Sequence, residues 1–242
     1  MRMIENKNYI LRAAKLAGKA MHDYSMIQDK DKILVGLSGG KDSFTLLHIL
    51  SARRKWIPVS YDLYAVYVKL NAPCGVSAAK MNLEKLCADL DVHFQEITIE
   101  IDEPRKSSCF WCSWNKRKTL FNACQDLGCN KLALGHHKDD IVETFLLNLF
   151  YHGQIATMPP KLDFFGGKLT LIRPLVYMEE TMTKRYAEEH DFASVSCSRE
   201  FFDTTKRSMV KNLISNLKHD IPKIKSNLFN SLKKEIDREY IL

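Results

Sequence analysis

Short apolar runs alternate with stretches of helical periodicity over the first two thirds of the chain. Four runs have the length and composition of buried strands: 32–37, 61–70, 92–99 and 131–135. Four segments after them show apolar residues at helical spacing: 43–54, 77–91, 114–128 and 138–153. Strands that alternate with helices of this length indicate βαβ units, so we expect an α/β fold with a doubly wound parallel sheet.

Helical periodicity also appears at both ends of the chain. One pattern, at 9–24, precedes the first strand, and three more follow the sheet, at 179–192, 205–220 and 222–240. The segment 156–175 has the character of loop and short strand. We therefore predict three parts: an N-terminal helix over 1–28, an α/β domain over 29–178 and a helical C-terminal region over 179–242.

The composition is that of a soluble globular chain. Its 242 residues, 45% of them hydrophobic, can bury a sizeable core. No apolar run approaches the roughly 20 residues that span a bilayer, and the N-terminus lacks the apolar core of a signal peptide. We therefore expect a cytoplasmic protein with no membrane partner.

Basic residues are concentrated near the C-terminus. The chain has 36 Lys and Arg against 29 Asp and Glu, a net charge of +7. Between Lys206 and Tyr240, nine Lys and Arg stand against four Asp and Glu, which accounts for most of that excess. A solvated helix face explains such a run, and a polyanionic partner such as RNA is the alternative interpretation.

A cluster of small and charged residues separates the first predicted strand from the helix that follows. Its sequence is SGGKDS, residues 38–43. Successive backbone N–H groups at a helix N-terminus bind anions, and Gly39 and Gly40 let the backbone approach a phosphate. A Walker A loop would need one more residue between its glycines and Ser or Thr in place of Asp42. We therefore expect a phosphate loop of another type.

A second polar loop, GHHKDD at 135–140, follows the fourth predicted strand and opens a helix. Because both loops follow parallel strands, we expect them to share the carboxyl edge of the sheet. Asp139 and Asp140 suit a helix N-terminus, so capping explains them, and simple packing explains one histidine. Ligation of one metal by both His136 and His137 is disfavoured because adjacent side chains point apart.

Seven cysteines in a chain without an export signal argue against a disulfide framework. Cys109 and Cys112 form the motif CFWC just ahead of a predicted helix. That motif suits a redox dithiol, half of a zinc site or part of an iron–sulfur cluster. No second CxxC exists to complete a zinc site, and a thioredoxin-like domain would not carry a phosphate loop upstream. We expect four other cysteines to be structural: Cys74, Cys87, Cys124 and Cys129.

In its strand-to-helix context, SGGKDS resembles the pyrophosphate loop of the PP-loop ATPases, which cleave ATP between the α and β phosphates and adenylate a substrate. GHHKDD and the downstream motifs FYHG, MPPKL and IRPL resemble one branch of that group, the tRNA 2-thiocytidine synthetases. The resemblance covers roughly residues 30–220 and implies the PP-loop, adenine nucleotide α-hydrolase-like fold.

The resemblance also implies roles for individual residues. Five residues would hold the pyrophosphate of ATP: Ser38, Gly39, Gly40, Lys41 and Ser43. Asp42 would act through Mg²⁺ or through the geometry of the loop. Four residues of the second loop would contribute to the nucleotide site: Gly135, His136, His137 and Asp140. Cys109, Cys112 and Cys197 would hold a [4Fe-4S] cluster that leaves one iron without a protein ligand.

The chain departs from the family pattern at two places. The family usually has a second CxxC downstream, where this chain has the single Cys197, and the cluster needs only one cysteine there. The family also tends to have an aspartate at the end of the second strand, where Asn71 is the nearest candidate. The first departure bears on the exact subfamily, and the second on the nucleotide contacts at that strand end.

The function implied by the resemblance is ATP-dependent thiolation of a tRNA pyrimidine, with 2-thiocytidine at position 32 as the expected product. Adenylation would turn the C2 oxygen into a leaving group, and sulfide held on the open iron would then attack C2. A cysteine desulfurase or another sulfide donor would supply the sulfur. The basic C-terminal helices would bind tRNA, and the protein would form a homodimer.

Two other functions stay open at the level of sequence. One is another PP-loop adenylating reaction, such as lysidine or amide formation, with zinc or no metal at the cysteines. The other is a nucleotide-binding or redox dithiol regulator without catalysis.

Overall fold

The structure is a computed structural model that describes residues 2–71, 83–100, 109–192 and 206–236 of the chain. Its strands are β1 (Asp31–Leu37), β2 (Tyr61–Asn71), β3 (His93–Glu100), β4 (Lys131–Ala133), β5 (Lys161–Phe164) and β6 (Leu169–Ile172). They form one sheet in the order β3-β2-β1-β4-β6-β5. All neighbouring pairs are parallel except β5 with β6. The predicted doubly wound α/β fold is confirmed.

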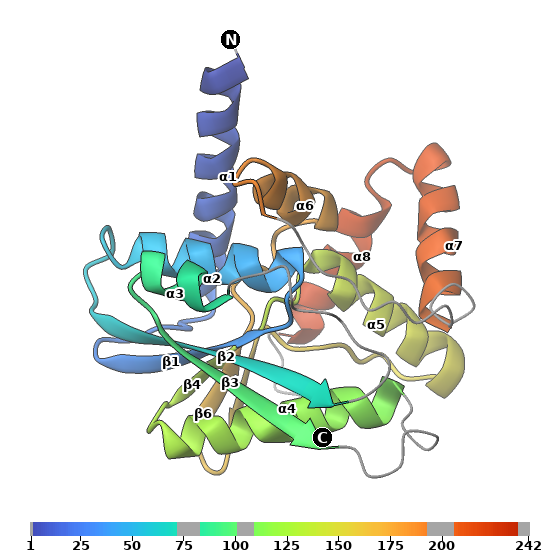
Figure 1. Cartoon of the computed structure of the whole chain (residues 1–242). Coiled ribbons are helices and arrows are strands. Elements are labelled where there is room, and N and C mark those ends of the chain that lie inside the picture. Colours follow the sequence, from blue (N-terminus) through green and yellow to red (C-terminus); the bar gives the residue numbers. More distant parts are fainter. Residues whose placement is uncertain (1, 72–82, 101–108, 193–205, 237–242) are drawn as a thin grey trace.

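The helices that the structure describes connect and cover these strands. They are α1 (Arg2–Asp23), α2 (Lys41–Arg53), α3 (Leu83–Asp89), α4 (Cys109–Asp126), α5 (Lys138–His152), α6 (Glu180–Glu188), α7 (Lys206–Asp220) and α8 (Ile224–Ile236). Figure 1 shows α2 and α3 on one side of the sheet and α4 on the other.

Alternate residues of β1 contribute to two separate cores. Ile33, Val35 and Leu37 pack into the core that α1, α2, α5 and α6 share on one face of the sheet. Leu34 packs on the other face with α4 residues that include Leu120. A strand that is buried on both faces has no polar side to show, which explains the continuous apolar run in the sequence.

The segment 156–175 contains more regular structure than the sequence predicted. In place of a loop with a short strand it carries an antiparallel hairpin, β5 and β6. Phe165, Gly166 and Gly167 close the hairpin with φ values of 55°, 66° and 84°. Two glycines adopt positive φ at little cost, so the chain can reverse direction there.

The prediction that CFWC lies ahead of its helix is wrong, because α4 begins at Cys109. Cys, Phe and Trp have modest helix propensity, so the sequence suggested a later start. The position of α4 is determined by its C-terminal half, where Leu120, Ala123 and Cys124 pack against the sheet. Both cysteines of the motif therefore belong to the first turn of α4 rather than to a preceding loop.

The C-terminal helices pack against the α/β core. Helix α6 lies against α2, and α7 and α8 lie against α5. Val210, Ile214, Phe229 and Leu232 of α7 and α8 are buried in the same core as α2. The division of the chain into three parts stays a prediction.

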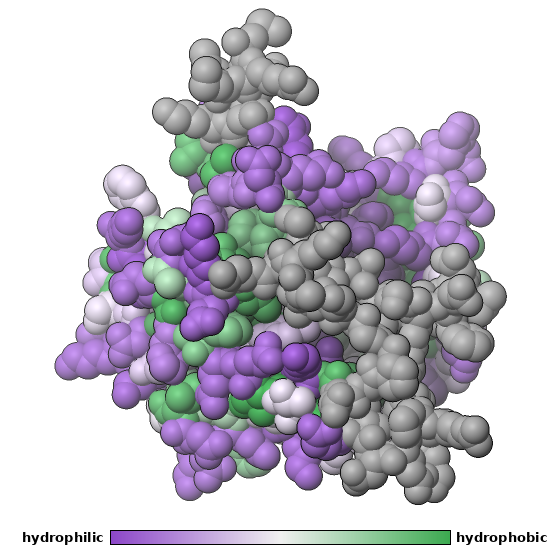
Figure 2. Space-filling view, in the orientation of Figure 1, coloured by the Kyte–Doolittle hydropathy of each residue, from purple (hydrophilic) through white to green (hydrophobic). Residues whose placement is uncertain are grey.

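The described surface is largely polar. Figure 2 shows hydrophilic residues over most of it on the face seen in Figure 1, with smaller hydrophobic areas between them. Among the described helices, none combines the length and the apolar composition needed to cross a membrane.

Candidate functional site

The SGGKDS loop is a compact turn held by its own two serines. Gly39 has φ 79°, a conformation that glycine adopts without strain. The Ser43 hydroxyl lies 3.1 Å from the Ser38 amide nitrogen and donates to the Gly40 carbonyl at 3.0 Å. The Ser38 hydroxyl accepts from the Gly40 amide at 3.2 Å. The loop is therefore held in its shape by its own hydrogen bonds.

The helix that follows this loop has an open N-terminus. Gly40 is the N-cap of α2, and no side chain caps the helix there. The first amide groups of an uncapped helix need an acceptor and carry the positive end of the helix dipole. The start of α2 is thus suited to an anion such as phosphate.

The second loop differs from the first because the helix that follows it, α5, has its N-terminus capped by a complete capping box. The His137 ring accepts from the Asp140 amide at 3.4 Å, and the Asp140 carboxylate accepts from the His137 amide at 3.0 Å. The capping role expected for Asp140 is confirmed, and the N-cap itself is His137, for which the sequence suggested only packing. Since its amides are already paired, this loop is less suited to cradle a phosphate than the first.

The two loops are in direct contact, as expected from their shared edge. A Cβ atom on Gly135 would lie 2.9 Å from the carbonyl carbon of Asp42, so only glycine fits there. His137 Nε2 lies 3.7 Å from Asp42 Oδ1. The GHHKDD loop therefore packs directly against the phosphate loop and restricts its position.

Lys41 points into a group of carboxylates. Its Nζ lies 3.0 Å from Asp42 Oδ2 and 3.2 Å from Glu180 Oε1. Burial lowers the pKa of Lys41, but the charges of Asp42 and Glu180 outweigh burial and raise it overall. Thr183 Oγ1 also donates to Asp42 Oδ1, at 2.5 Å. Asp42 is thus held by Lys41 of α2 and Thr183 of α6, with His137 nearby.

Glu180 joins the phosphate loop to the basic C-terminal helices. Its second oxygen accepts from Lys211 Nζ of α7 at 2.6 Å. Burial raises the pKa of Glu180, but the hydrogen bond from Lys211 and the charge of Lys41 outweigh it and lower the pKa to about 2. Glu180 is therefore ionised at neutral pH and binds two lysines from distant parts of the chain.

Further basic side chains of α7 and α8 also turn toward carboxylates of α5. Arg207 Nε lies 3.2 Å from Glu143, and another of its nitrogens lies 3.9 Å from Asp140. Lys225 forms an ion pair with Asp139, which also accepts from the Glu180 amide at 2.9 Å. Part of the C-terminal positive charge is thus paired with carboxylates of the site, which holds α7 and α8 against it.

His136 projects to the other side of the GHHKDD loop, toward the residue that follows β6. Arg173 Nε donates to His136 Nδ1 at 3.1 Å, and Arg173 Nη1 donates to the Pro159 carbonyl at 2.5 Å. Burial lowers the pKa of His136 to about 3, and the charges of Arg173 and Arg117 act in the same direction. His136 is therefore neutral, with its proton on Nε2.

The cysteines fall into two chemical groups. Cys87, Cys124 and Cys129 are buried in the cores, and burial raises the pKa of their thiols to about 12, 12 and 11. Cys112, three residues after Cys109 in the first turn of α4, is only half-buried. The structural role expected for Cys87, Cys124 and Cys129 agrees with these positions.

Cys74 and Cys197 lie outside the described residues, so the expected place of Cys197 beside the CxxC pair stays a prediction. Within residues 2–71, 83–100, 109–192 and 206–236, no group of three or more His, Cys, Asp or Glu side chains is arranged to hold a metal ion. Asn71 is the last residue of β2.

Sequence reasoning missed Glu180, Thr183 and Lys211. Glu180 and Thr183 of α6 contact Lys41 and Asp42 of the phosphate loop, and Lys211 of α7 contacts Glu180. Nothing in their local spacing distinguishes them from ordinary surface residues of amphipathic helices. Arg173 belongs to the IRPL motif, but its contact with His136 could not be read from that motif.

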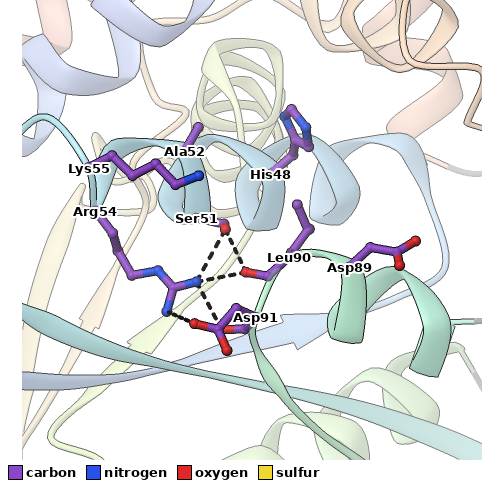
Figure 3. A pocket seen from close by; sticks show the side chains of 8 residues that line it. All are labelled: His48, Ser51, Ala52, Arg54, Lys55, Asp89, Leu90 and Asp91. Atoms are coloured by element: carbon purple, nitrogen blue, oxygen red, sulfur yellow. Dashed lines mark hydrogen bonds and ion pairs between the residues drawn. The ribbon is translucent and has the colours of Figure 1, made fainter.

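A cavity of about 540 Å³ lies at the opposite edge of the sheet, between the C-terminal ends of α2 and α3. Figure 3 shows that Arg54 reaches across it to Ser51 and to the end of α3. Arg54 Nη2 donates to the carbonyls of Leu90 and Asp91 at 2.7 and 2.9 Å. These bonds tie the end of α2 to the residues that follow α3, so this arginine serves the fold. The cavity contains no residue of either loop of the candidate site.

Comparison with known proteins agrees with this geometry. The fold and the anion-binding loop define a PP-loop protein, and a family model described as a PP-loop domain matches residues 11–217. A tRNA-cytidine(32) 2-sulfurtransferase of Syntrophotalea carbinolica is 39% identical over 90% of this chain and 86% of the relative. Another, of Geobacter sulfurreducens, is 39% identical over 96% of this chain and 92% of the relative. The chain belongs to the family of the tRNA-cytidine(32) 2-sulfurtransferases, which confirms the resemblance inferred from its motifs.

A solved structure supports the fold. The U34-tRNA thiolase NcsA from Methanococcus maripaludis, solved with its [4Fe-4S] cluster, matches with a TM-score of 0.76 at 20% sequence identity. The match covers 96% of this chain and 80% of the thiolase.

Proposed function

We propose that the protein is an ATP-dependent tRNA sulfurtransferase that forms 2-thiocytidine at position 32. Membership of a family whose curated relatives are named for that reaction is the main support. The observation of this chain that carries the proposal is the SGGKDS loop, held by its own hydrogen bonds, on the uncapped start of α2. A phosphate cradle and a CxxC pair on one α/β domain suit a reaction that combines adenylation with sulfur transfer.

The phosphate loop would bind ATP and direct its cleavage. The amides at the start of α2 would bind the pyrophosphate, and Lys41 would turn from Glu180 and Asp42 to the phosphate oxygens. The C2 oxygen of cytosine would then attack the α-phosphorus and release pyrophosphate. Sulfide would attack C2, and AMP would leave with the oxygen. ATP supplies the leaving group, so no oxidant or reductant is required.

The cysteines of α4 would hold a [4Fe-4S] cluster together with Cys197. Cys109 and Cys112 are three residues apart in a helix, which places them on one face at its positive end. The buried cysteines are unsuited because their raised pKa values disfavour the thiolate that binds iron. When bound, the cluster supplies a Lewis-acidic iron that carries sulfide.

Asp42 would act mainly through the geometry of the loop. Its carboxylate oxygens are engaged by Thr183 and Lys41, and His137 lies 3.7 Å from one of them. Such an arrangement fits a residue that fixes the loop better than a free ligand for Mg²⁺. Magnesium would then reach the site with the phosphates of ATP.

We further propose a cytoplasmic homodimer that takes sulfur from a cysteine desulfurase or another sulfide donor. The exposed basic side chains that remain in this region, such as Lys218 of α7 and Lys223 just ahead of α8, would contact the tRNA backbone. A regulator without catalysis is less favoured, because the relatives of this chain are named for a sulfurtransferase reaction.

Anaerobic reconstitution with tRNA, ATP and sulfide tests the proposal. Nucleoside mass spectrometry should detect 2-thiocytidine, with release of AMP and pyrophosphate. Cys109→Ala should lose both the visible absorption of the cluster and the product, and the matched variant Cys87→Ala should keep both. A colourless protein that contains zinc and forms no thionucleoside would favour a different adenylating enzyme.

A further inference from the structure

Arg173 is a buried cation that has no counter-ion among the described residues. Its side chain is 7% exposed, and its hydrogen-bond partners are a neutral histidine and a backbone carbonyl. No carboxylate of the described residues lies within ion-pair distance of it, although Asp140 is close enough to influence it. A charge that is removed from water without a partner is costly, so such a position calls for an anion.

The guanidinium group keeps unused donors beside a second donor. Of its five N–H groups, one binds His136 and one binds Pro159. Because His136 Nδ1 accepts from Arg173, His136 Nε2 carries the proton and can also donate. Neither Arg173 Nη2 nor His136 Nε2 has an acceptor in the described part of the chain. Together they form a pair of donors with positive charge.

The pair lies at the same edge of the sheet as the phosphate loop and close to α4. The phosphate loop follows β1, His136 follows β4 and Arg173 follows β6, which are neighbours at the carboxyl edge. Two strand spacings separate Arg173 from the phosphate loop, about 10 Å. Arg117, five residues after Cys112 on α4, is near enough for its charge to act on both His136 and Arg173.

We propose that Arg173 and His136 form a second anion site, which binds a backbone phosphate of the RNA substrate beside the target nucleotide. The phosphates of ATP already have the amides of α2 and Lys41, so the nucleotide does not need this pair. A substrate that binds at both the phosphate loop and the start of α4 would lie near this pair, which shares the sheet edge with the loop and is close to Arg117 of α4. The inference rests on the proposed function, since it takes tRNA as the substrate.

Binding measurements on four proteins test the site: the wild type, Arg173→Gln, Arg173→Lys and the control Lys55→Gln. Lys55 is an exposed residue of the opposite sheet edge, so Lys55→Gln removes the same charge away from the site. The tRNA affinity is measured by fluorescence anisotropy at several salt concentrations, and the affinity for a non-hydrolysable ATP analogue by calorimetry.

Arg173→Gln should bind tRNA about tenfold more weakly, and the slope of log affinity against log salt should fall by about one. Arg173→Lys should keep the wild-type slope because it keeps the charge, and Lys55→Gln should leave both quantities unchanged. The affinity for the ATP analogue should be the same in all four proteins. A merely structural role would not change the salt slope.

Two results would overturn the site. One is a tRNA affinity and salt slope of Arg173→Gln equal to those of the wild type, and the other is a loss of ATP-analogue affinity in place of tRNA affinity. If Arg173→Gln does not fold, His136→Ala decides: it should weaken tRNA binding severalfold at an unchanged slope, and unchanged binding rejects the site. A wild-type protein that binds no tRNA would instead reject the proposed function.

Discussion

The contact between Gly135 and the phosphate loop gives the sharpest single-residue test of the site. In Gly135→Ala, the new Cβ would lie 2.9 Å from the Asp42 carbonyl carbon and 3.0 Å from the Asp42 oxygen and the Ser43 nitrogen. These are backbone atoms, so no side chain can turn away to relieve the clash. An ordinary contact begins at 3.4 Å, and the two loops must therefore separate by about 0.5 Å.

That separation has a cost in both stability and ATP binding. Overpacking of this kind lowers the free energy of unfolding by roughly 1–3 kcal/mol. It also moves the amides at the start of α2 away from the position that fits a phosphate. Loss of two charge-assisted hydrogen bonds, at about 1.5 kcal/mol each, would weaken ATP binding roughly a hundredfold.

Calorimetry with a non-hydrolysable ATP analogue measures the affinity, and chemical denaturation measures the stability. Gly128→Ala is the matched control: Gly128 has φ 65°, and a Cβ there would meet nothing within 4 Å. It should lose about 1–2 kcal/mol through backbone strain and keep its ATP affinity. If Gly135→Ala is destabilised but binds the analogue as tightly as the wild type, the contact between the loops does not shape the ATP site.

Three further outcomes follow from the charges and thiols. The pKa of Glu180 is about 2 in the folded protein against an ordinary 4.5, so its stabilising effect is complete above pH 4.5 and is lost toward pH 2. The difference in free energy of unfolding between the wild type and Glu180→Gln, measured by denaturation, should therefore shrink as the pH falls over that range. Burial and the charge of His190 lower the pKa of His48 from 6.5 to about 4, so stability should fall as pH drops through that window, and His48→Gln should show a shallower fall. In metal-free folded protein, iodoacetamide should alkylate Cys112 before Cys87 and Cys124, as read by peptide mass spectrometry, and equal rates would contradict the assigned burial.

The pattern of apolar residues predicted the sheet because its central strands are buried on both faces. The run 32–37 contains residues of both cores, and a strand of this kind cannot be mistaken for a half-exposed one. The phosphate loop was equally visible, because its glycines and serines act within six residues of each other. Contacts between residues this close in the sequence can be predicted from the sequence alone.

The rest of the site depends on contacts across the chain. Glu180 and Thr183 lie about 140 positions after the phosphate loop and reach it only because α6 packs on α2. The basic residues Lys211 and Lys225 suggested a nucleic-acid surface, yet each is paired with a carboxylate. Net charge reports how many lysines a helix carries, but not which way they point.

Nucleoside analysis of tRNA tests the central claim most directly. Bulk tRNA is compared by mass spectrometry between cells that contain the protein, cells that lack it, and cells complemented with wild type or with Cys109→Ala. The account predicts that 2-thiocytidine disappears without the protein, returns with the wild type and does not return with the variant. An unchanged level of 2-thiocytidine in cells that lack the protein would contradict it.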